Sequence, residues 1–130
     1  MQTFKLLQIK LIVLLAVMVT LSSCSSTAGK VKTYLQCGIA ASQLERREAE
    51  RRITEKFATF ARQNNIDLSS RELMLLGQEV RNEMGLHEKS MEGQLYTFVK
   101  IYNSSACMAL HEQEKIASLP FKYYLLYFFI

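Results

Sequence analysis

Apolar side chains recur at helical spacing through most of this chain, and that spacing is the strongest constraint on its fold. Three segments carry the pattern, at residues 31–64, 70–85 and 90–117. Apolar residues three or four positions apart share one face of a helix, so each segment can bury a stripe against the others. The predicted inward-facing residues are Tyr34, Leu35, Ile39, Ala41, Leu44, Ile53, Phe57, Phe60, Ala61, Leu73, Leu76, Val80, Met84, Met91, Leu95, Phe98, Tyr102 and Ala106. We therefore predict an all-α fold, a small bundle of three to four helices.

Local signals mark where the predicted helices begin and end. Residues 64–68 are polar and asparagine-rich and should end the first helix. Ser69 with Glu72 matches a capping box, which places the start of the second helix at Ser70. Gly85 is well placed to end it. A single proline and five glycines in 130 residues make a many-turned β-sandwich unlikely, and the length suits one domain.

The segment before the helices has the parts of an export signal. Lys5 and Lys10 supply positive charge, and residues 11–19 form an uninterrupted apolar run. This run fits a secretory signal and is too short to span a membrane. It leads into Leu21, Ser22, Ser23 and Cys24.

This ending resembles the lipobox of bacterial lipoproteins, in which a leucine and two small residues precede a cysteine. The resemblance implies lipidation of the Cys24 sulfur, cleavage before Cys24 and acylation of the new amino terminus. Ser25 and Ser26 follow instead of an aspartate, which in this family implies export to the outer membrane. We expect the anchored protein to face the periplasm. We expect a signal peptide at 1–23, a lipidated flexible tether at 24–31, a helical domain at 32–119 and an aromatic tail at 120–130.

Lipidation of Cys24 leaves Cys37 and Cys107, and the oxidising periplasm makes a disulfide between them the expected pairing. The alternative is a metal site that includes His87 or His111, although neither histidine has a recognised ligand spacing to a cysteine. The disulfide constrains the helices. Either the second and third run together, bent near Gly85, against the first, or the first helix breaks near Gly38.

Charge gives no support to a nucleic-acid partner. Without Lys5 and Lys10, 14 basic and 12 acidic residues remain, a net charge of +2. Residues 45–52 interleave glutamates with arginines, and this pattern favours a solvated helix face with Glu48–Arg52 and Arg51–Glu55 pairs.

No pattern of residues predicts catalysis. The chain lacks a nucleophile-elbow motif, a glycine-rich loop after a strand and an H-E-x-x-H motif. His87 beside Glu88, and His111 beside Glu112, are interpreted as surface pairs. We expect no enzymatic activity, no cofactor and no metal.

Nine of the last ten residues are apolar or aromatic. Three explanations stay open: the tail completes the core, it contacts the membrane or a partner, or it is a truncated or frame-shifted end. The candidate contact residues are Phe121, Tyr123, Tyr124, Tyr127, Phe128 and Phe129.

The layout of lipobox, short tether, helices and two distant cysteines is similar to that of pilotins, the small secretion-system lipoproteins that hold a short helix of a secretin subunit in a groove. This resemblance implies an adaptor or assembly factor that binds the membrane through its lipid and a partner protein through its domain. The alternative function is that of an exclusion, immunity or inhibitor-type surface lipoprotein.

Overall fold

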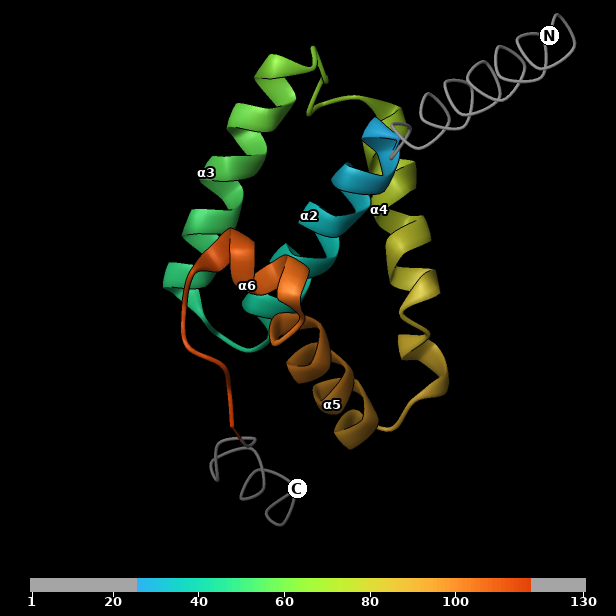
Figure 1. The fold of residues 1–130 in the computed structure, drawn as a ribbon. Coiled ribbons are helices and arrows are strands. Elements are labelled where there is room, and N and C mark those ends of the chain that lie inside the picture. Colours follow the sequence, from blue (N-terminus) through green and yellow to red (C-terminus); the bar gives the residue numbers. More distant parts are fainter. Residues whose placement is uncertain (1–25, 118–130) are drawn as a thin grey trace, which may run out of the picture.

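A computed structural model describes residues 26–117 (Figure 1). These residues form only helices: α2 (Thr27–Gln43), α3 (Arg47–Gln63), α4 (Arg71–Glu83), the short 3₁₀ helix η1 (Leu86–Glu88), α5 (Met91–Tyr102) and α6 (Ser105–His111). The predicted all-α class is confirmed for this range. Residues 26–117 contain five α-helices rather than three to four, because two of the predicted helices each break in two. Cys24 and the six aromatic residues singled out in the tail lie outside the described residues.

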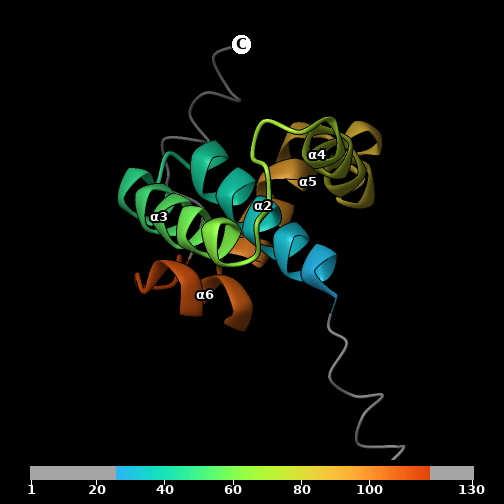
Figure 2. The ribbon, with the colours of Figure 1, turned by 90° about the horizontal axis from the view of Figure 1, so that it is seen from above.

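Helix α2 is the centre of the domain. It packs against α3, α4, α5 and α6, and Figures 1 and 2 show these helices arranged around it. Its contact face is built from small side chains, and Ala40 and Ala41 have no exposed surface. A side chain at Gly38 would come within 3.9 Å of Ile53 on α3. Small residues allow several helices to approach one axis closely, which explains why this segment has few large apolar residues.

The first predicted helix breaks at Glu45 and not near Gly38. Glu45 adopts a left-handed backbone conformation with φ 55°. The N–H of Glu45 donates to the Ser42 carbonyl, and the N–H of Arg46 donates to the Ala41 carbonyl at 2.8 Å. This pair of bonds is a Schellman motif, which satisfies the last carbonyls of α2. Glycine is the usual residue at such a position, so a glutamate there leaves no signal in the sequence.

The expected tether was too long. Helix α2 begins at Thr27, with Ser26 accepting a hydrogen bond from the N–H of Gly29. Val31 is already buried, with 4% of its surface exposed. Residues 27–31 therefore belong to the folded domain.

The third predicted helix also breaks, at Asn103 and Ser104, and it ends at His111 rather than near Ala117. The Ser104 hydroxyl accepts a hydrogen bond from the N–H of Cys107 and so starts α6. The run Asn103, Ser104, Ser105 consists of residues that favour helix starts over helix interiors, and this signal was present in the sequence.

The second predicted helix has nearly the expected bounds. The cap is Ser70, whose hydroxyl accepts from the N–H of Leu73, whereas Ser69 bonds to the carboxylate of Asp67. The capping-box assignment to Ser69 was wrong by one residue. Gly85 ends the helix as predicted, with φ 62°.

The helices between residues 26 and 117 are too short or too polar for any of them to span a membrane.

The predicted disulfide is confirmed, because Cys37 and Cys107 are bonded with their Cα atoms 5.4 Å apart. The bond joins the middle of α2 to the first turn of α6. The two helix breaks return the chain to α2, so the long antiparallel helices that would have separated these cysteines do not form.

The core of the described domain surrounds this bond. Its buried residues are Cys37, Ala40, Ala41, Leu44, Ala49, Ile53, Val80, Met84, Phe98, Tyr102, Cys107 and Ile116. Phe57 and Phe60 are half-buried and lie against the Tyr34 ring, with centroids 5.2 and 5.3 Å away. Met91 and Ala106 were predicted to face inward but are exposed. Both lie in the first turn of a helix, where helical periodicity specifies orientation poorly.

Candidate functional site

A groove of about 410 Å³ lies over the disulfide, between α2, α4, α5 and the first turn of α6. Its volume falls in the usual range for ligand sites. The lining residues come from all four helices and the loop before α5: Thr33, Gln36, Cys37, Glu83, Met84, Lys89, Thr97, Lys100, Ile101, Ser104, Ala106 and Cys107. None of them was predicted as a contact residue from the sequence.

The base of the groove is apolar and rigid. Cys37 and Cys107 are almost fully buried, and so is Met84. Ile101 is half-buried beside them. Because the disulfide links two of the groove's helices, it holds the width of the groove fixed. A short apolar side chain fits such a surface better than water does.

The rim carries basic groups. The Lys89 ammonium donates to the Met84 carbonyl at 2.8 Å. Lys32 binds Glu79 at 2.7 Å and Glu83 at 2.8 Å, and these two bonds raise the pKa of Lys32. Glu83, the acidic residue of the groove lining, is thus already paired with a lysine. Lys100 is exposed and forms no ion pair within residues 26–117, so its ammonium is available to an acidic group on a ligand.

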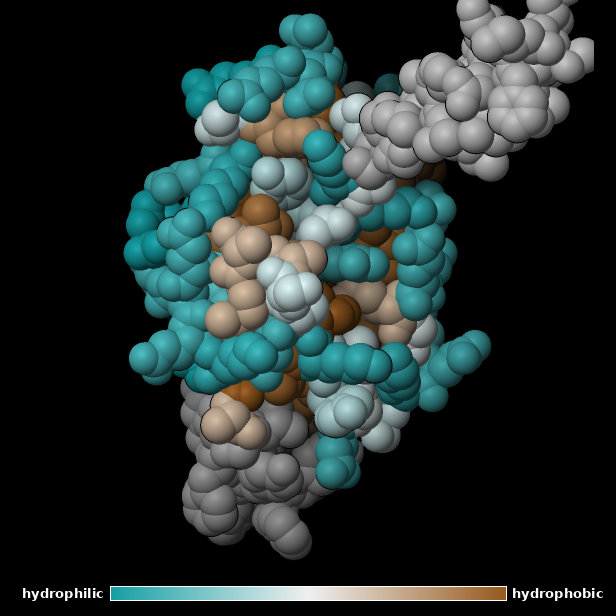
Figure 3. Space-filling model, in the orientation of Figure 1, coloured by the Kyte–Doolittle hydropathy of each residue, from teal (hydrophilic) through white to brown (hydrophobic). Residues whose placement is uncertain are grey.

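A larger hollow of about 760 Å³ is a weaker candidate. It lies along α2 and α3 and is lined by Ser42, Glu45, Arg47, Glu50, Arg51, Thr54 and Glu55. Acidic and basic groups alternate there and no apolar base is present. Figure 3 shows one face of the domain, on which hydrophilic residues border hydrophobic ones that gather toward the middle. We therefore take the groove over the disulfide as the candidate site.

His111 is a core residue, and its interpretation as a surface partner of Glu112 was wrong. None of its surface is exposed. Its Nδ1 accepts from the N–H of Gln113 at 2.9 Å, and its Nε2 lies 3.0 Å from the Tyr102 carbonyl. Because Nδ1 accepts, Nε2 must carry the proton and donate it. The ring also stacks on Tyr102, with centroids 4.1 Å apart. His87, in contrast, is exposed.

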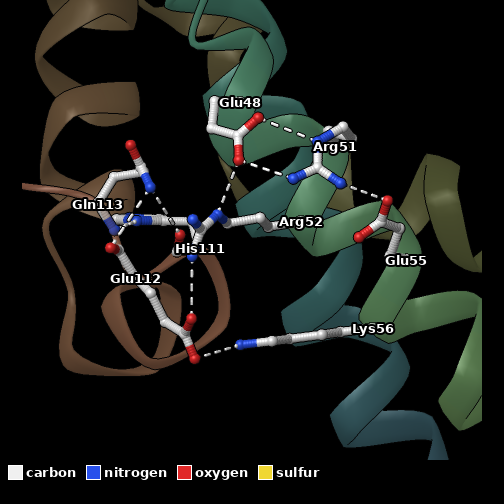
Figure 4. Close-up of polar contacts among 8 residues, drawn as sticks. All are labelled: Glu48, Arg51, Arg52, Glu55, Lys56, His111, Glu112 and Gln113. Carbon is white, nitrogen blue, oxygen red and sulfur yellow. Dashed lines mark hydrogen bonds and ion pairs between the residues drawn. The ribbon is translucent and has the colours of Figure 1, made fainter.

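The exposed carboxylates near His111 form an ion-pair cluster that joins α3 to the end of α6 (Figure 4). Both predicted pairs, Glu48–Arg52 and Arg51–Glu55, are present. Glu112 accepts from Lys56 and Arg52, each at 3.0 Å.

Hydrogen bonds keep two of these carboxylates, Glu48 and Glu112, ionised. Arg51, and then Arg52, lower the pKa of Glu48 to about 2. Lys56, and then Arg52, lower the pKa of Glu112. A general acid or base works best with a pKa near the working pH. The cluster therefore suits the attachment of α6 to α3 better than proton transfer.

Metal binding at the cysteines is contradicted, since both sulfur atoms are used in the disulfide. Within the described part of the chain, no group of three histidine, cysteine, aspartate or glutamate side chains lies close enough together to hold a metal ion.

The groove residues were missed because no single segment identifies them. Thr33, Met84, Lys100 and Cys107 are distant in sequence and meet only when four helices pack. The one available signal was the disulfide, since Cys37 and Cys107 lie at the base of the groove. Comparisons of the chain with protein-family models, with curated proteins and with solved structures find no match.

Proposed function

We propose that this protein is a non-enzymatic, lipid-anchored adaptor of the bacterial envelope that binds a segment of a partner protein in the groove over its disulfide. The anchor would be Cys24, at the outer membrane and facing the periplasm. The observation that carries the proposal is the groove itself, with its basic rim and its apolar base that contains the disulfide.

The cysteine pairing supports export. Cys37 and Cys107 bond to each other, and the remaining cysteine of the chain is the one in the lipobox. Disulfides persist in oxidising compartments such as the periplasm. The pairing therefore agrees with a protein that leaves the cytoplasm and keeps Cys24 for lipid.

The groove supports a partner of defined chemistry. Met84 and Ile101 favour an apolar side chain, and Lys100 favours a carboxylate next to it. The segment that fits is a short stretch of protein with one or two apolar residues flanked by an acidic one. This specifies the adaptor function implied by the resemblance to pilotins.

Metabolic labelling with a fatty-acid analogue tests the anchor. The wild-type protein should take up the label and float with outer-membrane fractions, and Cys24→Ala should lose both properties. Equal labelling of the two proteins would contradict the lipid anchor.

Site-specific photo-cross-linking in cells tests the groove. Benzoylphenylalanine at Thr97, which lines the groove, should give a defined cross-linked product. The same group at Tyr96, the neighbouring exposed residue outside the groove, is the control and should not.

A charge reversal tests the proposed ligand chemistry. Lys100→Glu should weaken the cross-link from position 97, whereas Lys115→Glu, an exposed lysine outside the groove lining, should leave it unchanged. A product that forms equally from positions 96 and 97, or that Lys100→Glu leaves intact, would contradict binding in the groove. A cross-linked protein encoded by secretion genes would favour an assembly factor, and a plasmid- or toxin-encoded one the exclusion or immunity alternative.

A further inference from the structure

Three large apolar side chains are exposed at one end of the domain. Leu68, in the loop before α4, has 48% of its surface exposed, and Met74 and Leu75 on α4 have 60% and 49%. Helix α4 packs mainly against α2 and η1, and the exposure of Met74 and Leu75 shows that these side chains lie outside that packing within residues 26–117. Exposed apolar groups that gather in one region indicate a contact surface.

The same end of the domain holds the first described residue. Helices α2 and α4 both begin at this end and run in the same general direction (Figure 1). Lys32, near the start of α2, binds Glu79 and Glu83, near the end of α4. At a rise of 1.5 Å per residue, Ser26 lies about 9 Å closer to this end than Lys32 does. The same distance along α4 leads from Glu79 back to about Leu73. Ser26 is therefore level with the start of α4.

The chain leaves little distance between this end and a lipid on Cys24. Only Ser25 separates Cys24 from Ser26, and α2 begins at Thr27. Two residue steps span at most about 7 Å when fully extended. An acylated Cys24 would therefore hold the start of α2 at the depth of the lipid headgroups.

We infer that the domain rests on the membrane through this end, with Leu68, Met74 and Leu75 inserted among the headgroups of a phospholipid surface. The inference rests on the proposed lipid anchor. Charge does not drive the contact, because Lys30, Arg62 and Arg71 at this end are nearly balanced by Asp67 and Glu72. The surface should therefore bind zwitterionic lipid, through its apolar groups.

Two methionines with the same exposure make a matched pair for the test. Met74 and Met91 are each 60% exposed, and Met91, at the start of α5, lies at the opposite end of the domain (Figure 1). The full lipidated chain, as Met74→Cys or Met91→Cys, is labelled with an environment-sensitive fluorophore. It is then reconstituted into phosphatidylcholine vesicles that contain brominated lipid. Circular dichroism checks that each variant keeps its helices, and Leu75→Cys serves if Met74→Cys does not fold.

The label at position 74 should lose about half of its fluorescence to the brominated lipid, and the label at position 91 should lose almost none. Equal quenching at the two positions, or quenching only at 91, would overturn the inferred orientation. Flotation and fatty-acid labelling of the same samples separate the two proposals. Acylated protein that floats without quenching at 74 contradicts the orientation alone. Protein that is neither acylated nor bound to vesicles contradicts the anchor and, with it, the orientation.

Discussion

At the scale of single residues, His111 connects the end of α5 to the segment that follows α6. Its imidazole accepts a hydrogen bond from the N–H of Gln113, after α6, and donates one to the carbonyl of Tyr102, at the end of α5. Both ring nitrogens are satisfied without contact with water. A buried polar residue with every hydrogen bond made specifies one arrangement of its surroundings.

Replacing His111 with phenylalanine should destabilise the domain. The change keeps a ring for stacking on Tyr102 but leaves the Tyr102 carbonyl and the Gln113 N–H without these partners. We expect a loss of roughly 2–4 kcal/mol in the free energy of unfolding, measured by urea denaturation. The same change at exposed His87 is the control and should have little effect. Equal losses at the two positions would show that His111 has no special role.

The lowered pKa of Glu48 predicts that the folded domain loses stability in acid. Its pKa falls to about 2 in the folded protein because Arg51 and Arg52 donate hydrogen bonds to it, whereas the ordinary value is 4.5. A carboxyl with a lowered folded pKa contributes stability above its unfolded pKa and loses it as the pH falls toward the folded value.

The melting temperature should therefore drop between pH 5 and pH 2, and the drop should be smaller in Glu48→Gln. High salt should also reduce the difference, because these side chains are exposed. Glu114→Gln, an exposed carboxylate with no ion pair among residues 26–117, is the control and should leave the curve unchanged. Identical curves for Glu48→Gln and the wild type would contradict this role.

At the scale of elements, the end of α5 holds the segment that follows α6. The Asn103 amide donates to the Ile116 carbonyl at 2.8 Å, and its oxygen accepts from the Ile116 N–H at 2.9 Å. These two bonds hold Ile116 against the core, where only 7% of its surface is exposed. The Asn103 side chain thus satisfies both the backbone N–H and the carbonyl of Ile116, and it holds residues 112–117 against the end of α5.

Removing that amide should release the segment. In Asn103→Ala, both hydrogen bonds are lost and Ile116 has less to hold it in the core. We expect a loss of about 1–3 kcal/mol and faster hydrogen exchange at the Ile116 amide. Asn82→Ala, at an exposed position on α4, is the control. Unchanged exchange at Ile116 in Asn103→Ala would show that packing alone holds the segment.

At the scale of the whole molecule, the disulfide closes a separation of 70 residues between the central helix and α6. In the chain-entropy treatment, a loop of that length stabilises the folded state by about 4 kcal/mol. Because the domain is small, this is a large share of a typical stability of about 5–15 kcal/mol.

Removing both cysteines should therefore lower the unfolding free energy by about 4 kcal/mol, measured by denaturant titration of Cys37→Ala combined with Cys107→Ala. Reduction of the wild type should give a loss of the same size, which serves as an internal control. The groove should lose its fixed width as well, so cross-linking from Thr97 should weaken. A double variant as stable as the oxidised wild type would contradict this account.

Short-range patterns in the sequence were enough to predict several features. The helical class follows from apolar spacing, and the ends at Asn64 and Gly85 follow from residues that favour those conformations by themselves. The disulfide followed from the count of cysteines and the expected compartment. Each of these features depends on neighbouring residues or on composition, so it can be predicted without the tertiary structure.

Other features depended on contacts between distant segments, and only the tertiary structure decided them. Glu45 takes a left-handed conformation that a glutamate does not favour locally, and packing on both sides of the turn holds it there. His111 is buried because Tyr102 and Gln113 satisfy it, which its neighbour Glu112 gave no reason to expect. The groove exists only where four helices meet. Local preferences amount to fractions of a kcal/mol per residue, and the burial of a shared core outweighs them.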